Sequence, residues 1–256
     1  MDGKQYRLRE FIRPEDGHSL IVDTSSGLAL GVLPGLDDFG AAARSVLPVV
    51  DGLVCSPGQL RRIPERTRGE ASLLVRMDWT NTLRGPDFVL PPAATKRVPL
   101  LTVQDAQELG ATAMVTTFLL GYEEEIEGAC LKQVVQWALD GNSIGLPLIV
   151  EVRATGPRVS IPHKAIELGA SYALEGGADA IVIPYPGRKS LEAIAAMVSV
   201  PWLIKPSHFE NAAAELNEAI ELGGAGVWFD HTVFARSNTV EMLQDFAVQV
   251  HQAAAA

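Results

Sequence analysis

Eight short apolar runs, rich in β-branched residues, alternate along the 256-residue chain with longer segments of helical periodicity. A continuously apolar strand is buried on both faces, and alternation with helices is typical of a parallel sheet. The runs cover residues 20–23, 52–55, 73–76, 113–116, 148–151, 180–183, 202–205 and 226–229. The helical segments include residues 123–142, 160–176, 210–222 and 238–253. Eight strand–helix units in about 250 residues predict an α/β fold, a (β/α)8 TIM barrel, as one domain over residues 1–256.

Glycine and proline mark the boundaries between these segments. Gly110, Gly169 and Gly223 each follow a leucine just before an expected strand, where a left-handed cap ends a helix. The Pro-rich segment 85–101 is long for a strand-to-helix loop. It is expected to be an irregular excursion above the third strand, on the face that carries the active site.

Charge and cysteine content restrict the partners. The chain has 21 Lys+Arg against 31 Asp+Glu, a net charge of −10, so we expect no binding to nucleic acid or to an anionic membrane surface. No apolar run approaches the roughly 20 residues that cross a bilayer, and the first residues lack a secretory signal. Cys55 and Cys130 have no metal-ligand spacing, and no disulfide between them is expected. We therefore expect a cytoplasmic protein without a metal or other cofactor.

Charged side chains stand at the C-terminal ends of five of the eight expected strands. Barrel enzymes carry their catalytic groups at these C-terminal strand ends, and a charge there is costly unless it is paired or solvated. Each residue alone could belong to a rim salt bridge, but the whole set indicates an active site. Its members are Asp23, Arg76, Asp78, Glu151, Arg153, Lys205, His208, Asp230 and His231.

Several framework segments resemble a known family. Residues 7–14 (RLREFIRP), 20–23 and 34–37 are similar to the start of the archaeal-type class I fructose-bisphosphate aldolases, relatives of the tagatose-bisphosphate and deoxyribose-phosphate aldolases. The resemblance continues through residues 108–113, 121–124, 145–150, 177–182, 200–204 and 223–227, nearly the whole chain. It implies a barrel, a carbon–carbon bond lyase or synthase activity on a small carbonyl substrate, and a homo-oligomer.

The chain departs from the family at its functional positions. The Schiff-base lysine of the family falls on Pro184, which has no nucleophile, so this is a divergent member. The family's phosphate-binding turns read Lys205-Pro206-Ser207 and Asp230-His231 here, and such side chains disrupt an anion-binding nest. The substrate is therefore not expected to be a sugar bisphosphate. Three further family positions, a tyrosine, a histidine and a lysine, hold Arg153, Thr24 and Pro57.

Lys205 is the candidate for a relocated Schiff-base amine. Desolvation, with Arg76 or Arg153 if either lies close, would lower its pKa, whereas pairing with Glu151 or Asp230 would make it structural. The expected catalytic residues are Lys205, Asp23, Arg153, Asp230 and His231. The expected substrate-binding residues are Arg76, Asp78, Glu151, Tyr185 and His208, and an arginine there suits a substrate carboxylate.

Two alternatives remain open. One is a noncovalent or metal-assisted acid/base lyase or isomerase, because Asp23, Glu151, Asp230 and His231 are possible oxygen and imidazole ligands. The other is a catalytically inactive binding barrel in which the loss of the lysine at Pro184 is decay.

Overall fold

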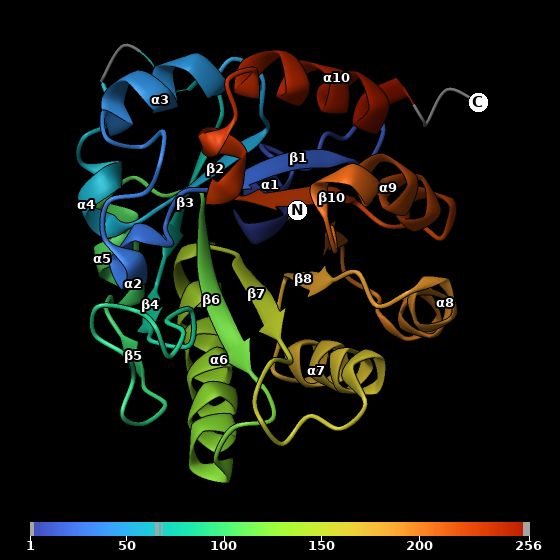
Figure 1. Cartoon of the computed structure of the whole chain (residues 1–256). Helices are drawn as coiled ribbons and strands as arrows, with labels where there is room; N and C mark the ends of the chain where they lie inside the picture. Colours follow the sequence, from blue (N-terminus) through green and yellow to red (C-terminus); the bar gives the residue numbers. More distant parts are fainter. Residues whose placement is uncertain (1–2, 65–66, 68, 253–256) are drawn as a thin grey trace.

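A closed barrel of eight parallel strands forms the centre of the computed structural model, which describes residues 3–64, 67 and 69–252 (Figure 1). The barrel strands are β1 (Ser19–Asp23), β2 (Gly52–Cys55), β3 (Ser72–Arg76), β6 (Ala113–Leu119), β7 (Leu148–Arg153), β8 (Ala180–Pro184), β9 (Trp202–Lys205) and β10 (Gly226–Asp230). Their order around the barrel is β1-β10-β9-β8-β7-β6-β3-β2. Each of the eight apolar runs lies in one of these strands, so the predicted fold class is confirmed.

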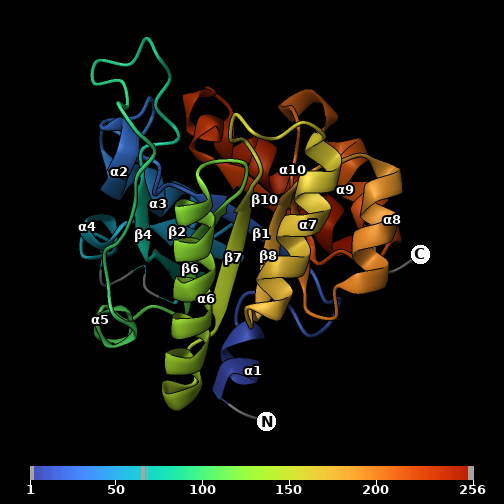
Figure 2. The same cartoon turned by 90° about the horizontal axis from the view of Figure 1, so that it is seen from below.

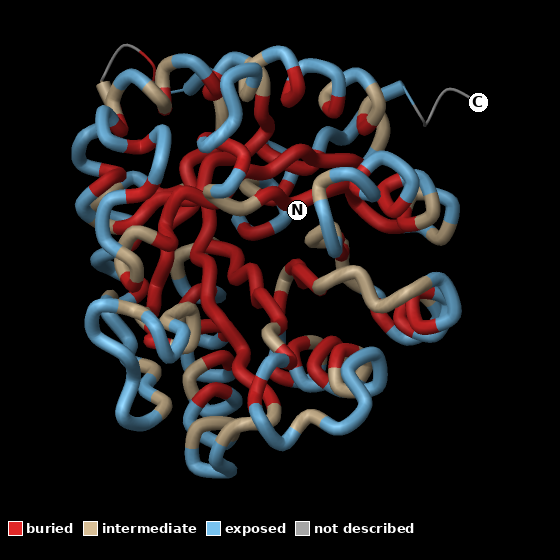
Figure 3. Tube along the Cα trace, in the orientation of Figure 1, coloured by how far each residue is buried: buried red, intermediate tan, exposed pale blue. Residues whose placement is uncertain are grey.

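Helices surround the barrel, and their outer surfaces are exposed while the strands are buried (Figure 3). They are α1 (Gly3–Leu8), α2 (Gly27–Leu30), α3 (Phe39–Val46), α4 (Pro57–Leu60), α5 (Val103–Glu108), α6 (Glu124–Ile144), α7 (Pro162–Glu175), α8 (Arg188–Met197), α9 (Ala212–Glu221) and α10 (Thr239–Gln252), with the 3-10 turns η2 (Phe209–Asn211) and η3 (His231–Ala235). The four expected helical segments match α6, α7, α9 and α10. Residue 253, where the last was expected to end, lies outside the described residues, as do 254–256. Within the described part of the chain, no helix is long and apolar enough to cross a membrane.

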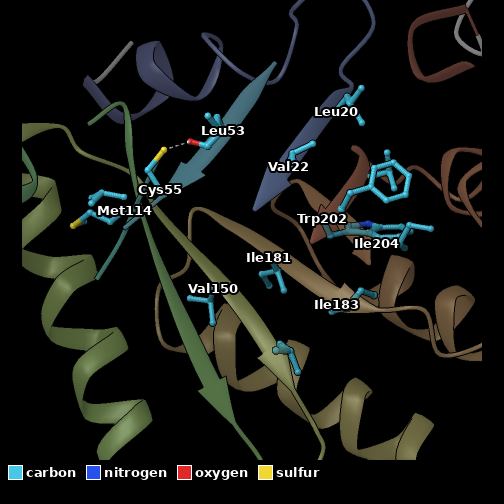
Figure 4. Packing of buried hydrophobic residues seen from close by; sticks show 14 of the residues in the cluster. Leu20, Val22, Leu53, Cys55, Met114, Val150, Ile181, Ile183, Trp202 and Ile204 are labelled. Atoms are coloured by element: carbon cyan, nitrogen blue, oxygen red, sulfur yellow. Dashed lines mark hydrogen bonds between the residues drawn. The ribbon is translucent and has the colours of Figure 1, made fainter. Parts of the chain in front are cut away.

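Two sets of apolar side chains fill the molecule. One set points outward and packs between the strands and the helices, as Figure 4 shows for Leu53, Met114, Val150 and Ile204. The other set fills the inside of the barrel and includes Leu8 and Phe11. These two residues lie in and just after α1, so α1 closes the N-terminal end of the barrel, opposite the loop at 81–96 (Figure 2).

Two of the three predicted glycine caps are confirmed. Gly110 and Gly223 have φ of 77° and 86°, the left-handed conformation that ends a helix at low cost for glycine. The prediction for Gly169 is wrong, because this residue lies inside α7, and the positive φ of 91° occurs at Gly177. A Cβ at Gly169 would lie 2.5 Å from the Val152 side chain. Glycine is thus needed there so that α7 can approach β7.

The Pro-rich segment 85–101 lies above the third barrel strand, as expected, but it is not irregular throughout. Its residues Arg97–Pro99 form β5, which pairs antiparallel with β4 (Asp78–Thr80). The Asn81 side chain holds the intervening loop by donating to the carbonyl of Ala94 at 2.7 Å and accepting from the Lys96 N–H at 2.8 Å. Asp78 therefore begins β4 rather than ending β3, which stops at Arg76.

Candidate active site

A polar layer lies directly above the apolar interior of the barrel, because side chains of a strand alternate between its two faces. The interior residues Ile21, Leu74, Val115, Ile149, Val182, Leu203 and Trp228 each come from a different strand. Two positions further along the same strands stand Asp23, Arg76, Thr117, Glu151, Pro184, Lys205 and Asp230. The sequence-predicted charges are thus brought together at the C-terminal mouth.

Arg76 and Asp23 form a buried ion pair in this layer. The Arg76 Nη2 lies 2.5 Å from Asp23 Oδ2, and both side chains are at most 5% exposed. Arg76 also donates to the hydroxyls of Ser25 and Thr117, each at 3.1 Å. Asp23 Oδ1 accepts from the Ser25 N–H at 2.8 Å. Protein acceptors thus bind all three nitrogens of the Arg76 guanidinium, which was expected to contact substrate.

Glu151 lies at the centre of the charge network. Its carboxylate faces Arg76 Nη1 at 2.9 Å, Arg153 Nη2 at 2.9 Å and Lys205 Nζ at 3.7 Å. Burial alone would raise the pKa of Glu151, but Arg153, Arg76 and Lys205 outweigh it and hold the pKa well below its usual range. The layer therefore contains three carboxylates (Glu151, Asp23 and Asp230), which balance the charges of its three cations (Arg76, Arg153 and Lys205).

Lys205 lies between two carboxylates. Its Nζ is 3.3 Å from Asp230 Oδ2 and 3.7 Å from Glu151 Oε1, and its side chain is 25% exposed. Lys205 thus pairs with both carboxylates that the sequence offered as partners, and it shares Glu151 Oε1 with Arg153. Burial would raise the pKa of Asp230, but Lys205 and bonds from Thr232 lower it, so Asp230 is a carboxylate near neutral pH.

His231 follows Asp230 at the edge of the same layer. Burial lowers its pKa more than the nearby carboxylates Asp230 and Asp23 raise it. The imidazole is therefore neutral at pH 7 and can accept a proton. Its Nδ1 is buried without a hydrogen-bond partner among the described residues.

Asp78 forms a second buried pair, with Arg97 of β5. Arg97 Nε donates to Asp78 Oδ2 at 2.8 Å and to the carbonyl of Thr117 at 2.9 Å, and the guanidinium lies 5.7 Å from the centre of the Trp137 ring. Both side chains are at most 3% exposed. Asp78 thus fastens the β4–β5 excursion to β6, beside the network.

Two of the predicted site residues are not part of this network. The Tyr185 hydroxyl donates to Glu218 of α9 at 2.7 Å, and burial together with this bond raises the pKa of Tyr185 to about 12. His208 is exposed in the loop after β9. Tyr185 and His208 have no ion pair with the charged layer, but His208 lines a cavity together with Lys205 and Asp230.

Among the described residues, members of the charged layer line two cavities. One of about 30 Å³ lies between Ser25, Arg76, Trp79 and Arg153, room for about two water molecules. The other, of about 290 Å³, lies between the loops that follow β9 and β10 and is lined by Lys205 and Asp230. This volume approaches the lower range of ligand pockets, so the space for a substrate is on the Lys205 side.

Sequence reasoning did not find four residues that hold the site: Ser25, Arg97, Thr117 and Glu215. Ser25 had a local signal, since a serine two positions after an aspartate favours a turn that binds the carboxylate. Thr117 could have been found by extending the alternation along β6. Arg97 and Glu215 carry no such signal, because they come from the short strand β5 and from the helix α9, not from the end of a barrel strand. No group of three or more His, Cys, Asp or Glu converges as a metal site within the described residues.

No family model matches the chain. It is 28% identical over 256 residues to the 2-amino-3,7-dideoxy-D-threo-hept-6-ulosonate synthase of Halobacterium salinarum, covering 97% of this chain and 92% of that protein. It is 26% identical over 264 residues to an uncharacterized aldolase of Saccharolobus solfataricus, covering 98% and 96%. The 3-hydroxy-5-phosphonooxypentane-2,4-dione thiolase of Escherichia coli K12 is 25% identical over 253 residues, with 97% and 82% covered.

The solved structures that resemble the chain include archaeal fructose-bisphosphate aldolases. A crystal structure of an archaeal fructose 1,6-bisphosphate aldolase superposes with a TM-score of 0.81 at 22% identity, covering 97% of this chain and 99% of that one. This likeness confirms the barrel. Because the sequence relatives are named as aldolases, a synthase and a thiolase, the chain is an aldolase-like enzyme.

Proposed function

We propose that this aldolase homologue is a carbon–carbon bond lyase or synthase that acts on a small carbonyl or keto-acid substrate through an imine on Lys205. The observation that carries the proposal is the position of Lys205. The residue belongs to the polar layer, its side chain is 25% exposed, and it lines the cavity of about 290 Å³. A structural neighbour is described as a Schiff-base-forming fructose-1,6-bisphosphate aldolase.

The other described lysines lie away from the mouth layer. Lys4 is buried at the N-terminal end of the barrel with Asp179, and Lys164 is paired with Glu167 on α7. Lys132 and Lys189 are on α6 and α8, and Lys96 is in the loop between β4 and β5. Pro184, two positions after Val182 on β8, pairs in register with Lys205 and offers no amine itself.

The chemistry requires a neutral amine and a base. Lys205 gives a proton to Asp230 Oδ2, 3.3 Å away, and its Nζ then attacks the substrate carbonyl carbon. The carbonyl oxygen takes one proton from Nζ and one back from Asp230 and leaves as water, and the resulting iminium accepts the electron pair of the breaking carbon–carbon bond. Asp230 or the neutral His231 takes the proton of the substrate hydroxyl that becomes the new carbonyl. The reverse sequence joins the two fragments.

Borohydride trapping tests this proposal. Pyruvate and dihydroxyacetone are the probes, a keto acid and an unphosphorylated ketose, and intact mass detects the reduced adduct. The wild-type protein is expected to gain one adduct with at least one of them. Lys205→Ala and Lys205→Arg are expected to gain none, because guanidinium stays protonated and cannot attack a carbonyl.

Lys96→Arg is the matched control, since it removes an amine from the same end of the barrel and should be trapped like the wild type. An adduct that survives in Lys205→Arg would refute the role of Lys205. Absence of any adduct, with turnover retained in Lys205→Arg, would instead establish noncovalent acid/base chemistry.

We also propose that the protein is a homo-oligomer and that it does not cleave fructose bisphosphate. A monomeric mass in solution or cleavage of that sugar would overturn these two points.

A further inference from the structure

The cavity beside Lys205 lies where (β/α)8 barrels commonly bind phosphate, between the loops after the seventh and eighth strands, here β9 and β10. A phosphate at such a site is held by backbone N–H groups and hydroxyls that point toward it. Whether these donors are free or already hydrogen-bonded within the protein therefore decides whether the pocket can bind a phosphorylated substrate.

Both donors of Ser207, in the loop after β9, are already bound inside the protein. The Ser207 N–H donates to Glu215 Oε2 at 2.8 Å, and the Ser207 hydroxyl donates to Glu215 Oε1. Glu215 comes from α9 and is only 6% exposed. An internal carboxylate thus occupies the acceptor position that a phosphate oxygen would take.

The loop after β10 repeats this arrangement. Asp230 Oδ1 accepts from the Thr232 N–H at 3.0 Å and from the Thr232 hydroxyl at 2.5 Å. The cations of the pocket are also paired, Lys205 with Asp230 at 3.3 Å and Arg236 with Glu210 at 3.7 Å. Asp230 and Glu210 thus balance the two cations in the pocket lining, and Glu215, bound to Ser207, adds a third carboxylate next to that lining.

We propose that Glu215 is a specificity-determining residue that excludes phosphate, so that the pocket takes the uncharged, hydroxylated end of an unphosphorylated carbonyl substrate. A phosphate would meet occupied donors and an excess of negative charge, whereas a hydroxyl can donate to Asp230 or Glu210. The inference rests on the proposed function only in treating this pocket as part of the active site.

Binding of inorganic phosphate, measured by isothermal titration calorimetry, tests the proposal. Glu215→Ala frees both donors of Ser207 and removes a negative charge, so it is expected to bind phosphate at least tenfold more tightly than the wild type. Glu215→Gln keeps an acceptor for the Ser207 N–H. Its amide donates to the Ser207 hydroxyl, which leaves the hydroxyl proton free for phosphate, so this variant should also gain affinity and carries the test if the alanine variant does not fold.

Glu221→Ala is the matched control, because it removes an exposed carboxylate of the same helix, paired with Arg188, and should behave like the wild type. Equal phosphate affinity in the wild type and in the Glu215 variants would overturn the proposal, as would no measurable binding in any of them. Phosphate forms no imine, so the result is independent of whether Lys205 is trapped by borohydride.

Discussion

At the scale of single residues, Glu151 determines the charge balance of the mouth. It is 1% exposed, and Arg76, Arg153 and Lys205 all lie within 3.7 Å of its carboxylate. Glu151→Gln would leave buried cations without their shared counter-ion. We expect it to lower the free energy of unfolding by about 3–5 kcal/mol, measured by urea denaturation.

Glu124→Gln provides the comparison, since this side chain is 79% exposed in its pair with Arg158. A surface ion pair is worth at most about 1 kcal/mol. If the two variants lost similar free energies of unfolding, the buried ion pairs of Glu151 would contribute no more to stability than a surface ion pair.

At the scale of helices and strands, two glycines in neighbouring helices have opposite roles. A Cβ at Gly169 of α7 would lie 2.5 Å from the Val152 side chain, whereas a Cβ at Gly128 of α6 would meet nothing within 4 Å. We expect Gly169→Ala to destabilise by about 1–3 kcal/mol through overpacking. Gly128→Ala should stabilise by about 0.5–1 kcal/mol through helix propensity. Thermal unfolding of both variants measures the difference, and two shifts of the same sign would contradict it.

At the scale of the whole molecule, His251 joins the last helix to the beginning of the barrel. Its Nδ1 lies 2.7 Å from Asp16 and its Nε2 lies 3.1 Å from Asp51, which also binds the Leu20 N–H at 2.7 Å. Burial alone would lower the pKa of His251, but the bonds and charges of Asp51 and Asp16 outweigh it and raise the pKa.

The folded state therefore binds the imidazolium in preference to the neutral ring. This contribution to stability is complete below the ordinary pKa of about 6.5 and is lost as the pH rises through the raised value. We expect His251→Gln to be less stable than the wild type by about 2 kcal/mol at low pH, the scale of hydrogen bonds to charged groups, and by less at high pH. Urea denaturation from pH 5 to 9 checks this, with the exposed His163→Gln as control; a gap that does not depend on pH would contradict it.

Much of the site could be read from local pattern. Strand alternation places Asp23, Arg76 and Glu151 two positions beyond interior apolar residues, and parallel strands bring such positions to one end of a barrel. The prediction at Gly169 failed because a glycine needed for close packing has the same sequence signature as a cap. Tyr185 is among the expected substrate-binding residues, and its hydroxyl is bound to Glu218 of α9.

The sequence by itself determined the barrel and the end at which the charges gather, because both follow from hydrophobic periodicity and chain direction. Only the tertiary structure decided which charges meet. The pairing of strands around the barrel sets Lys205 between Asp230 and Glu151. The tertiary structure also brings Arg97 of β5 and Glu215 of α9 to the site. Partner choice depends on distances of a few ångströms between segments far apart in the chain, and no local pattern of residues encodes those distances.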